Sequence, residues 1–163
     1  MRYFEKISEK QFKKDFKDIN TSYNDILLPK RATASAAGYD FYAPFSFSLK
    51  PGEIIMIPTG IKACLNNNEF LAIYVRSSMG FKYNIRMCNQ VGIIDCDYYN
   101  NTFNEGHIFI KLQNEGNGEY NINKGDKICQ GIIQQYYIVE NDNVDNIRKG
   151  GLGSTDKGEC NNE

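Results

Sequence analysis

From about residue 25 onward, apolar residues occur in short runs that are separated by polar turns. Phe45, Phe47 and Leu49 alternate with serines, and the turn-forming sequence Lys50-Pro51-Gly52-Glu53 follows. Further apolar runs cover residues 54–57, 61–65, 70–75, 85–95, 108–112 and 128–139. Breaks rich in Asn and Gly separate several of these runs. Short strands between frequent turns predict an all-β fold, as a sandwich, jelly roll or barrel.

The two ends of the chain have different patterns. Near the N-terminus, apolar residues fall close to helical spacing with charged residues between them, which predicts a short amphipathic helix within residues 1–20. These apolar residues are Phe4, Ile7, Phe12, Phe16 and Ile19. After Glu140 the chain becomes polar and rich in glycine, which predicts a mobile C-terminal arm. We therefore expect a helical extension over 1–24, a β domain over 25–140 and an arm over 141–163.

The composition narrows the class of protein. A length of 163 residues is that of one domain. Lys and Arg number 19 and Asp and Glu number 20, so the formal net charge is -1. This balance argues against nucleic acid or an anionic membrane as a partner, but leaves a local phosphate site open. No apolar run approaches the roughly 20 residues of a membrane-spanning helix, and the N-terminus has no signal-peptide pattern. We expect a cytoplasmic protein.

The metal-binding and thiol residues are few. The chain has 5 cysteines without a CxxC pair, and its one histidine is His107. This set argues against a structural zinc site, and the cysteines are expected to be reduced thiols.

Two segments with candidate chemistry lie in the first half of the chain. Ala37-Gly38-Tyr39-Asp40 places an acid beside a glycine, which on its own is also typical of a turn. Arg76-Ser77-Ser78-Met79-Gly80 follows the apolar run 70–75. Its arginine and hydroxyls could bind an anion, or a serine could cap a helix.

Two further segments lie in the second half. Asn89 to Tyr98 is an apolar run that ends in acids and an aromatic ring. A carboxylate such as Asp95 at the end of this run could act as a general base, or the acids could form a turn. We expect Asp97, two residues further on, to lie on the opposite face from Asp95, which makes it the weaker candidate for the base. Arg148 to Thr155 combines glycines with cationic and hydroxyl side chains, which could surround phosphate oxygens or belong to a mobile tail.

The order and spacing of these segments resemble the trimeric dUTP pyrophosphatase (dUTPase) family over roughly residues 28 to 155. The sequences that carry the resemblance are LPKRATASAAGYDFYAP, RSSMG, NQVGIIDCDY, KGDKICQ and RKGGLGSTDKG. The resemblance implies a jelly-roll subunit that forms a homotrimer with active sites shared between chains. It implies hydrolysis of dUTP to dUMP and pyrophosphate, which keeps uracil out of DNA and supplies dUMP for thymidylate synthesis.

The resemblance also assigns roles to residues. Asp95 is implied as the base that activates water for attack on the α-phosphate, and Asp40 and Arg148 as further catalytic residues. Tyr98 would pack on the deoxyribose and exclude a 2′-hydroxyl, and Asn89 would read uracil. The other implied substrate-binding residues are Arg76, Ser77, Ser78, Gly80, Gly92, Ile94, Gln130, Gly153, Ser154 and Thr155. The cofactor would be Mg²⁺, held by the triphosphate and waters without a protein ligand.

The chain departs from the family pattern at several positions. Ser78 and Leu152 stand where Gly and Phe are usual, and Phe4, Phe81 and Tyr83 are candidates to replace that aromatic ring. Residues Tyr99–His107 form an insertion, which could bind a regulatory protein. Two alternatives stay open: a dCTP deaminase of the same fold, and a binding module. The deaminase would need a catalytic Glu on the strand after the third motif, whereas in HIFIKLQNEG Glu115 comes only beyond the strand. A pure binding module is disfavoured because Asp95 and the arm are present.

Overall fold

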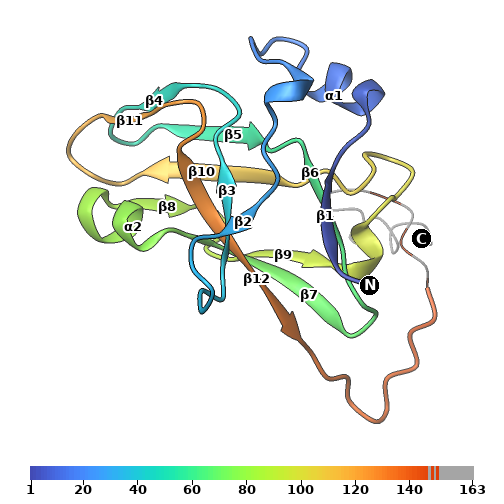
Figure 1. Ribbon diagram of the computed structural model, residues 1–163. Coiled ribbons are helices and arrows are strands. Elements are labelled where there is room, and N and C mark those ends of the chain that lie inside the picture. Colours follow the sequence, from blue (N-terminus) through green and yellow to red (C-terminus); the bar gives the residue numbers. More distant parts are fainter. Residues whose placement is uncertain (147, 149, 151–163) are drawn as a thin grey trace, which may run out of the picture.

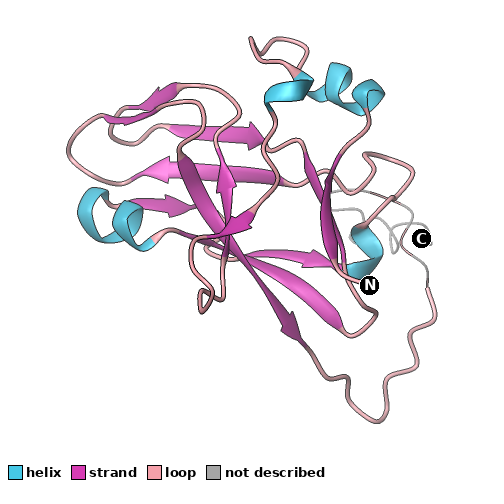
Figure 2. Ribbon diagram, in the orientation of Figure 1, coloured by secondary structure: helices cyan, strands magenta, loops and turns pink. Residues whose placement is uncertain are grey.

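The computed structural model describes residues 1–146, 148 and 150, and the chain in this range is mostly β (Figures 1 and 2). The strands are β1 (Tyr3–Lys6), β2 (Lys30–Arg31), β3 (Tyr39–Tyr42), β4 (Phe47–Leu49), β5 (Ile54–Pro58), β6 (Ile61–Cys64), β7 (Glu69–Val75), β8 (Ile85–Met87), β9 (Gly92–Asp95), β10 (Phe109–Asn114), β11 (Tyr120–Ile122) and β12 (Lys127–Gln135). The helices are α1 (Glu9–Asp15) and α2 (Ser77–Tyr83), with short 3-10 turns η1 (Tyr23–Asp25) and η2 (Cys96–Tyr98). The prediction of a mostly-β fold is confirmed.

The strands pair antiparallel throughout the described residues. The largest sheet has the order β2-β3-β12-β7-β9, and a second sheet has the order β5-β10-β8. Two smaller pairs are β1-β6 and β11-β4. Each predicted apolar run contains a strand, and the run 85–95 contains two, β8 and β9, which join different sheets.

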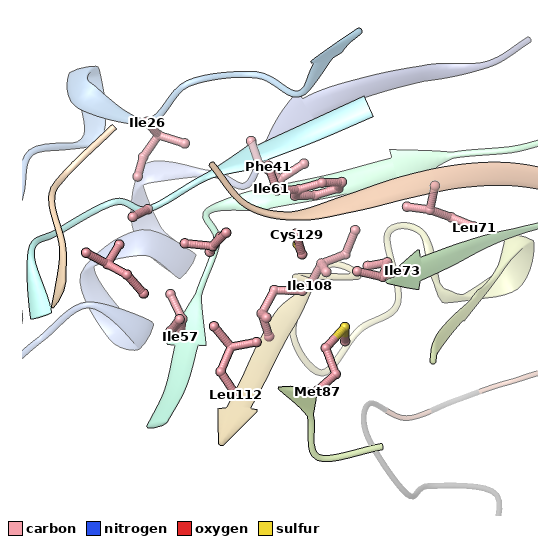
Figure 3. Packing of buried hydrophobic residues seen from close by; sticks show 14 of the residues in the cluster. Ile26, Phe41, Ile57, Ile61, Leu71, Ile73, Met87, Ile108, Leu112 and Cys129 are labelled. Atoms are coloured by element: carbon pink, nitrogen blue, oxygen red, sulfur yellow. The ribbon is translucent and has the colours of Figure 1, made fainter. Parts of the chain in front are cut away.

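The hydrophobic core lies between the two larger sheets. Figure 3 shows its buried side chains pointing toward one another from strands of both. They include Phe41, Leu71, Ile73 and Cys129 of the five-stranded sheet and Ile57, Met87 and Leu112 of the three-stranded sheet. Strand β10 shows the expected alternation, since Ile110 and Leu112 are buried and Lys111 between them is exposed.

The N-terminal prediction of a helix is wrong for residues 3–6, which form strand β1. This strand pairs with β6, with Phe4 opposite Ala63, and the Phe4 ring packs on Tyr39 and Phe41. A partner strand distant in the sequence satisfies its backbone, and the local pattern cannot show that partner. Helix α1 is shorter than the predicted stretch, and Ser8 caps it by accepting a hydrogen bond from the backbone of Gln11.

The N-terminal segment packs into the same hydrophobic core as the β strands. Ile7, Phe12 and Phe16 are buried in the main cluster, and the Phe12 and Phe16 rings stack with centroids 4.3 Å apart.

At the other end, β12 stops at Gln135, and the following residues leave the body of the molecule (Figure 1). Tyr137, Ile138 and Val139 there are 92%, 71% and 68% exposed. Within the described range, none of the helices is long and apolar enough to cross a membrane.

Candidate active site

Two acids at the end of β9 share one arginine. Strand β9 pairs with the first half of β7 and ends at Asp95, after which the 3-10 turn η2 redirects the chain. Arg148 Nη2 lies 2.5 Å from Asp95 Oδ2, and Arg148 Nε lies 2.8 Å from Asp97 Oδ1. The expectation that Asp97 points away from Asp95 is wrong, because residues two apart in a strand share a face. Here β9 ends at Asp95, and the turn η2 also leaves both acids facing Arg148. Both carboxylates are about half exposed, at 47% and 52%.

Tyr98 lies buried beside these acids. Its hydroxyl donates to the carbonyl of His107 at 3.0 Å and accepts from Nδ2 of Asn104 at 2.7 Å. Burial raises the pKa of Tyr98, so the hydroxyl stays protonated and able to donate. The Arg148 guanidinium lies over its ring, with Cζ 5.7 Å from the ring centroid. The turn η2 thus brings an acid, an aromatic ring and a cation into one cluster.

A second charged cluster surrounds Asp40. This carboxylate is buried in β3, and Arg76 Nε approaches one of its oxygens at 3.1 Å. Lys127 Nζ, at the start of β12, lies 2.7 Å from the other oxygen. Lys127 lies in the segment KGDKICQ but is not among the predicted site residues. A lysine at the start of an apolar strand was the only sequence signal for it.

Helix α2 begins directly after Arg76. The N-cap residue is Arg76 and makes no side-chain cap, while Ser77 and Ser78 are the first two helical residues. The alternative role of a serine as helix cap is therefore not found. Two cavities flank Arg76. Ser77, Gly80 and Phe81 line one of them, and Ser78 and Lys127 line the other.

Gln130 explains the glycine of the first motif. Gln130 stands opposite Asp40 on one side and Tyr74 on the other. A Cβ on Gly38 would come within 2.6 Å of Oε1 of Gln130, so a larger residue would displace this side chain. Gly38 thus leaves room for the amide beside Asp40.

The cluster around Asp95 and the cluster around Asp40 lie at opposite ends of β7. Asp95 stands opposite Phe70 near the start of β7, whereas Arg76 follows its last residue, Val75. At the usual rise and strand spacing, Asp95 and Asp40 are on the order of 15–20 Å apart. A single chain therefore does not bring all the predicted catalytic residues together.

Three predicted substrate-binding residues, Asn89, Gly92 and Ile94, lie in or beside the turn between β8 and β9. Asn89 is exposed in this turn, and Gln90 after it has a positive φ of 60°. Gly92 is buried opposite Ile73, where an added Cβ would lie 3.3 Å from the Cβ of Ile73. Ile94 packs against the core. Of the three, Asn89 is exposed, Ile94 is partly exposed and Gly92 is buried.

The structure describes the three candidate aromatic residues, but not the predicted binding residues after residue 150. Gly153, Ser154, Thr155 and Leu152 lie outside the described residues. Phe4 packs in the core and Tyr83 packs on Tyr120, with ring centroids 4.7 Å apart. Phe81 is 91% exposed at the rim of a cavity beside Arg76. Of the three candidates, only the Phe81 ring is largely free.

Comparison with known proteins places this arrangement in a family. The dUTPase family model matches residues 24–160. The chain is 42% identical over 142 residues to a deoxyuridine 5'-triphosphate nucleotidohydrolase of Lactococcus lactis, covering 85% of this chain and 95% of that protein. The chain belongs to the dUTPase family.

Other dUTPases agree with this assignment. The protein of the same name from Finegoldia magna is 38% identical over 146 residues, which cover 85% of this chain and 96% of that protein. The crystal structure of a dUTPase from Streptococcus mutans aligns with a TM-score of 0.69 at 34% identity, over 85% of this chain and 98% of that one. A mutant dUTPase of the Staphylococcus aureus phage phi11 aligns with a TM-score of 0.66 at 20% identity, over 90% of this chain and 97% of that one. At that identity the phage structure supports the fold alone.

The described residues contain no group of three or more His, Cys, Asp or Glu side chains arranged to hold a metal ion. Asp95 and Asp97 are both bonded to Arg148. Carboxylate oxygens are ligands that Mg²⁺ accepts, so the acids at the end of β9 are chemically compatible with this ion.

Proposed function

We propose how this member of the dUTPase family hydrolyses dUTP to dUMP and pyrophosphate. The single observation that carries the proposal is the cluster of Asp95, Tyr98 and Arg148 at the end of β9. It joins a half-exposed carboxylate, a buried aromatic ring and a cation. These are the groups that can activate water, limit the sugar and stabilise phosphate charge.

Asp95 is the general base in this proposal. Its side chain is 47% exposed and forms an ion pair with Arg148, which comes from a segment far along the chain. The carboxylate takes a proton from water as the water oxygen bonds to the α-phosphorus. The bond from that phosphorus to the bridging oxygen breaks, and pyrophosphate leaves with the electron pair.

Arg148 must leave its present position for this reaction. It lies over the Tyr98 ring, where the deoxyribose would pack, and it neutralises Asp95. When it releases Asp95 and binds the phosphates, the carboxylate can accept a proton and the guanidinium stabilises the developing charge. Gly153, Ser154 and Thr155 follow Arg148 along the arm and are proposed to bind the phosphates with it.

The remaining substrate contacts are divided between the two ends of β7. At the Asp95 end, Asn89 reads uracil beside Gly92 and Ile94, and Tyr98 borders the sugar. At the other end, Arg76, Ser77, Ser78, Gly80 and Gln130 bind phosphates. Asp40 has both carboxylate oxygens paired with cations, so it is proposed to hold Arg76 and Lys127 in place. Bound Mg²⁺ would neutralise phosphate charge, with the triphosphate and waters as its ligands.

A homotrimer of jelly-roll subunits would join these two ends. Because the ends are separated within one chain, a complete site needs a second copy of the protein. Exposed apolar residues are available for such contacts, among them Ile93 at 55% exposure and Tyr137 at 92%. The regulatory protein partner at residues 99–107 stays a prediction, because no contact in the described residues indicates it.

The activity is tested by pyrophosphate release from dUTP, dCTP, dTTP and UTP, each with and without Mg²⁺. We expect strong release from dUTP only, and only with Mg²⁺. Release from none of the four by a folded protein would contradict the proposed function, and conversion of dCTP to a uracil nucleotide would favour the deaminase.

The shared site is tested by mixing two inactive variants, Asp95→Asn and Arg76→Ala. If Asp95 and Arg76 of different chains form each site, random trimers from an equal mixture regain about one quarter of the sites. If both residues serve a site within one chain, unfolding and refolding the mixture restores no activity.

A further inference from the structure

The insertion 99–107 buries polar side chains that the proposed reaction does not use. Asn101 and Asn104 are 8% and 5% exposed, and His107 is fully buried. A buried amide or imidazole is costly unless its polar atoms find partners. No buried side-chain nitrogen or oxygen in the described part of the chain lacks one. Such complete pairing in a surface insertion indicates a loop with one defined conformation.

The hydrogen bonds of this loop converge on Tyr98. Asn104 Nδ2 donates to the Tyr98 hydroxyl at 2.7 Å, and Asn101 Nδ2 donates to the Tyr98 carbonyl at 2.8 Å. Asn101 also donates to Oδ1 of Asn104 at 2.8 Å, which fixes the orientation of the Asn104 amide. Gly106, with φ of 81°, packs so closely that an added Cβ would lie 2.6 Å from the Tyr98 carbonyl oxygen. The loop therefore holds both the backbone and the ring of Tyr98.

The end of the loop is fixed to helix α1. The backbone N–H of Gly60 donates to Nε2 of His107 at 2.8 Å, so Nε2 carries no proton. The proton is then on Nδ1, which donates to Oδ2 of Asp15 at 2.6 Å. The carbonyl of the same His107 accepts from Tyr98. A continuous series of contacts thus runs from Asp15 through His107 to the Tyr98 hydroxyl.

We propose that Asn104 is a positioning residue for sugar selection, because it holds the Tyr98 ring where a 2′-hydroxyl would collide with it. The inference rests on the proposed function, in which Tyr98 borders the deoxyribose. Asp15 supports the same arrangement from α1 by orienting His107. The insertion then serves discrimination between deoxyribonucleotide and ribonucleotide, and the N-terminal helix contributes to that discrimination without contacting substrate.

The test compares kcat/KM for dUTP with kcat/KM for UTP in Asn104→Leu, which has a similar size but no amide. Loss of one hydrogen bond to the ring is expected to lower the dUTP-to-UTP ratio about fivefold. Phe103→Ala is the matched control, because Phe103 is on the same loop but is 64% exposed. Its ratio should stay at the wild-type value.

Tyr98→Phe supplies a second measurement. This variant lacks the hydroxyl that Asn104 bonds, so adding Asn104→Leu to it should change the ratio little further. Additive effects in the double variant would contradict the proposal. An unchanged ratio in Asn104→Leu would also overturn it, as would an equal loss for both nucleotides, which is what a merely structural role predicts.

Asp15→Asn addresses the case in which Asn104→Leu does not fold. It keeps the shape of the side chain and weakens the bond to His107, and we expect a smaller fall in the same ratio. An unchanged ratio in this variant would overturn the proposal if Asn104→Leu is unfolded. If the wild-type protein releases no pyrophosphate from dUTP, the proposed function fails and the inference falls with it. Normal dUTP activity with unaltered variant ratios defeats the inference alone.

Discussion

Asp40 and Asp95 are both carboxylates of the five-stranded sheet, but their surroundings differ. Asp40 is buried, and each of its oxygens faces a cation, Arg76 or Lys127. Asp95 is half exposed and is paired with Arg148, which reaches it from 53 residues further along the chain. Water can therefore reach Asp95, whereas both oxygens of Asp40 are occupied within the fold.

This difference suits Asp40 to a structural role and Asp95 to a reactive one. A buried carboxylate with a cation at each oxygen is held in one position, which suits it to fixing the cations. A half-exposed carboxylate at a strand end, bonded to an arginine of the arm, can lose that partner and accept a proton. The same residue type thus serves two purposes, and the surrounding elements decide which.

The largest expected effect is that of Asp95→Asn on turnover. The amide cannot take a proton from water, so kcat for dUTP should fall about 10²- to 10⁴-fold with little change in nucleotide binding. Steady-state kinetics and equilibrium binding of dUTP measure the two quantities. A near-normal kcat would show that Asp95 is not the general base, and the proposed difference in role between Asp95 and Asp40 would be wrong.

Arg148→Ala should have the next largest effect. Loss of the guanidinium removes charge stabilisation from the reaction, so kcat is expected to fall about 10²-fold. Stability should change little, because Arg148 bonds two half-exposed acids. The combination of kinetics with a urea unfolding curve checks both. A fall in stability with intact kcat would show that Arg148 only anchors the arm.

Asp40→Asn should affect the fold more than Asp95→Asn does. Two cations would lose a buried partner, and since each is about one third exposed, we expect a loss of about 2 kcal/mol in the free energy of unfolding. Asp97→Asn is the matched control, because Asp97 is 52% exposed and should cost under about 0.5 kcal/mol. Equal losses in the two variants would refute the structural role of Asp40.

Glu69 offers the smallest and most specific test. This buried acid at the start of β7 is bonded to Arg2. The hydrogen bonds from Arg2 lower the pKa of Glu69 to about 2 from an ordinary value of 4.5. The stability that this shift supplies is present above about pH 4.5 and is lost as pH falls toward 2.

Arg2→Ala should remove that stability at neutral pH and flatten the dependence of the urea midpoint on pH between 4.5 and 2. Lys124→Ala is the control, because its ion pair with Asp25 is exposed on both sides and should contribute little. An unchanged acid profile in Arg2→Ala would show that Arg2 does not control the ionisation of Glu69.

Local pattern was sufficient for most strands and for the end of β9. The run 70–75 contains β7, and the alternation near residue 110 identifies the buried face of β10. The acids and the tyrosine after residue 94 also indicated a site, because they follow an apolar strand. Such features depend on neighbours within a few residues, and side-chain period alone reports them.

Local pattern failed where a distant partner decides. Tyr3–Lys6 shares apolar spacing with a helix but becomes a strand, since β6 accepts its backbone hydrogen bonds. Asn101 and Asn104 are typical loop residues in sequence, and only the folded loop buries them around Tyr98. The sequence does not predict the role of Lys127, because its partner Asp40 is 87 positions earlier in the chain.

The sequence by itself determined the β-rich class, the order of the five motifs and the residue types available for dUTP hydrolysis. These follow from side-chain chemistry and short-range periodicity. The tertiary structure alone decided that Arg76 and Asp95 stand at opposite ends of β7, and that Tyr98 is held by the insertion and indirectly by α1. Those facts depend on register and packing between segments far apart in the chain, and side-chain period within one segment does not specify them.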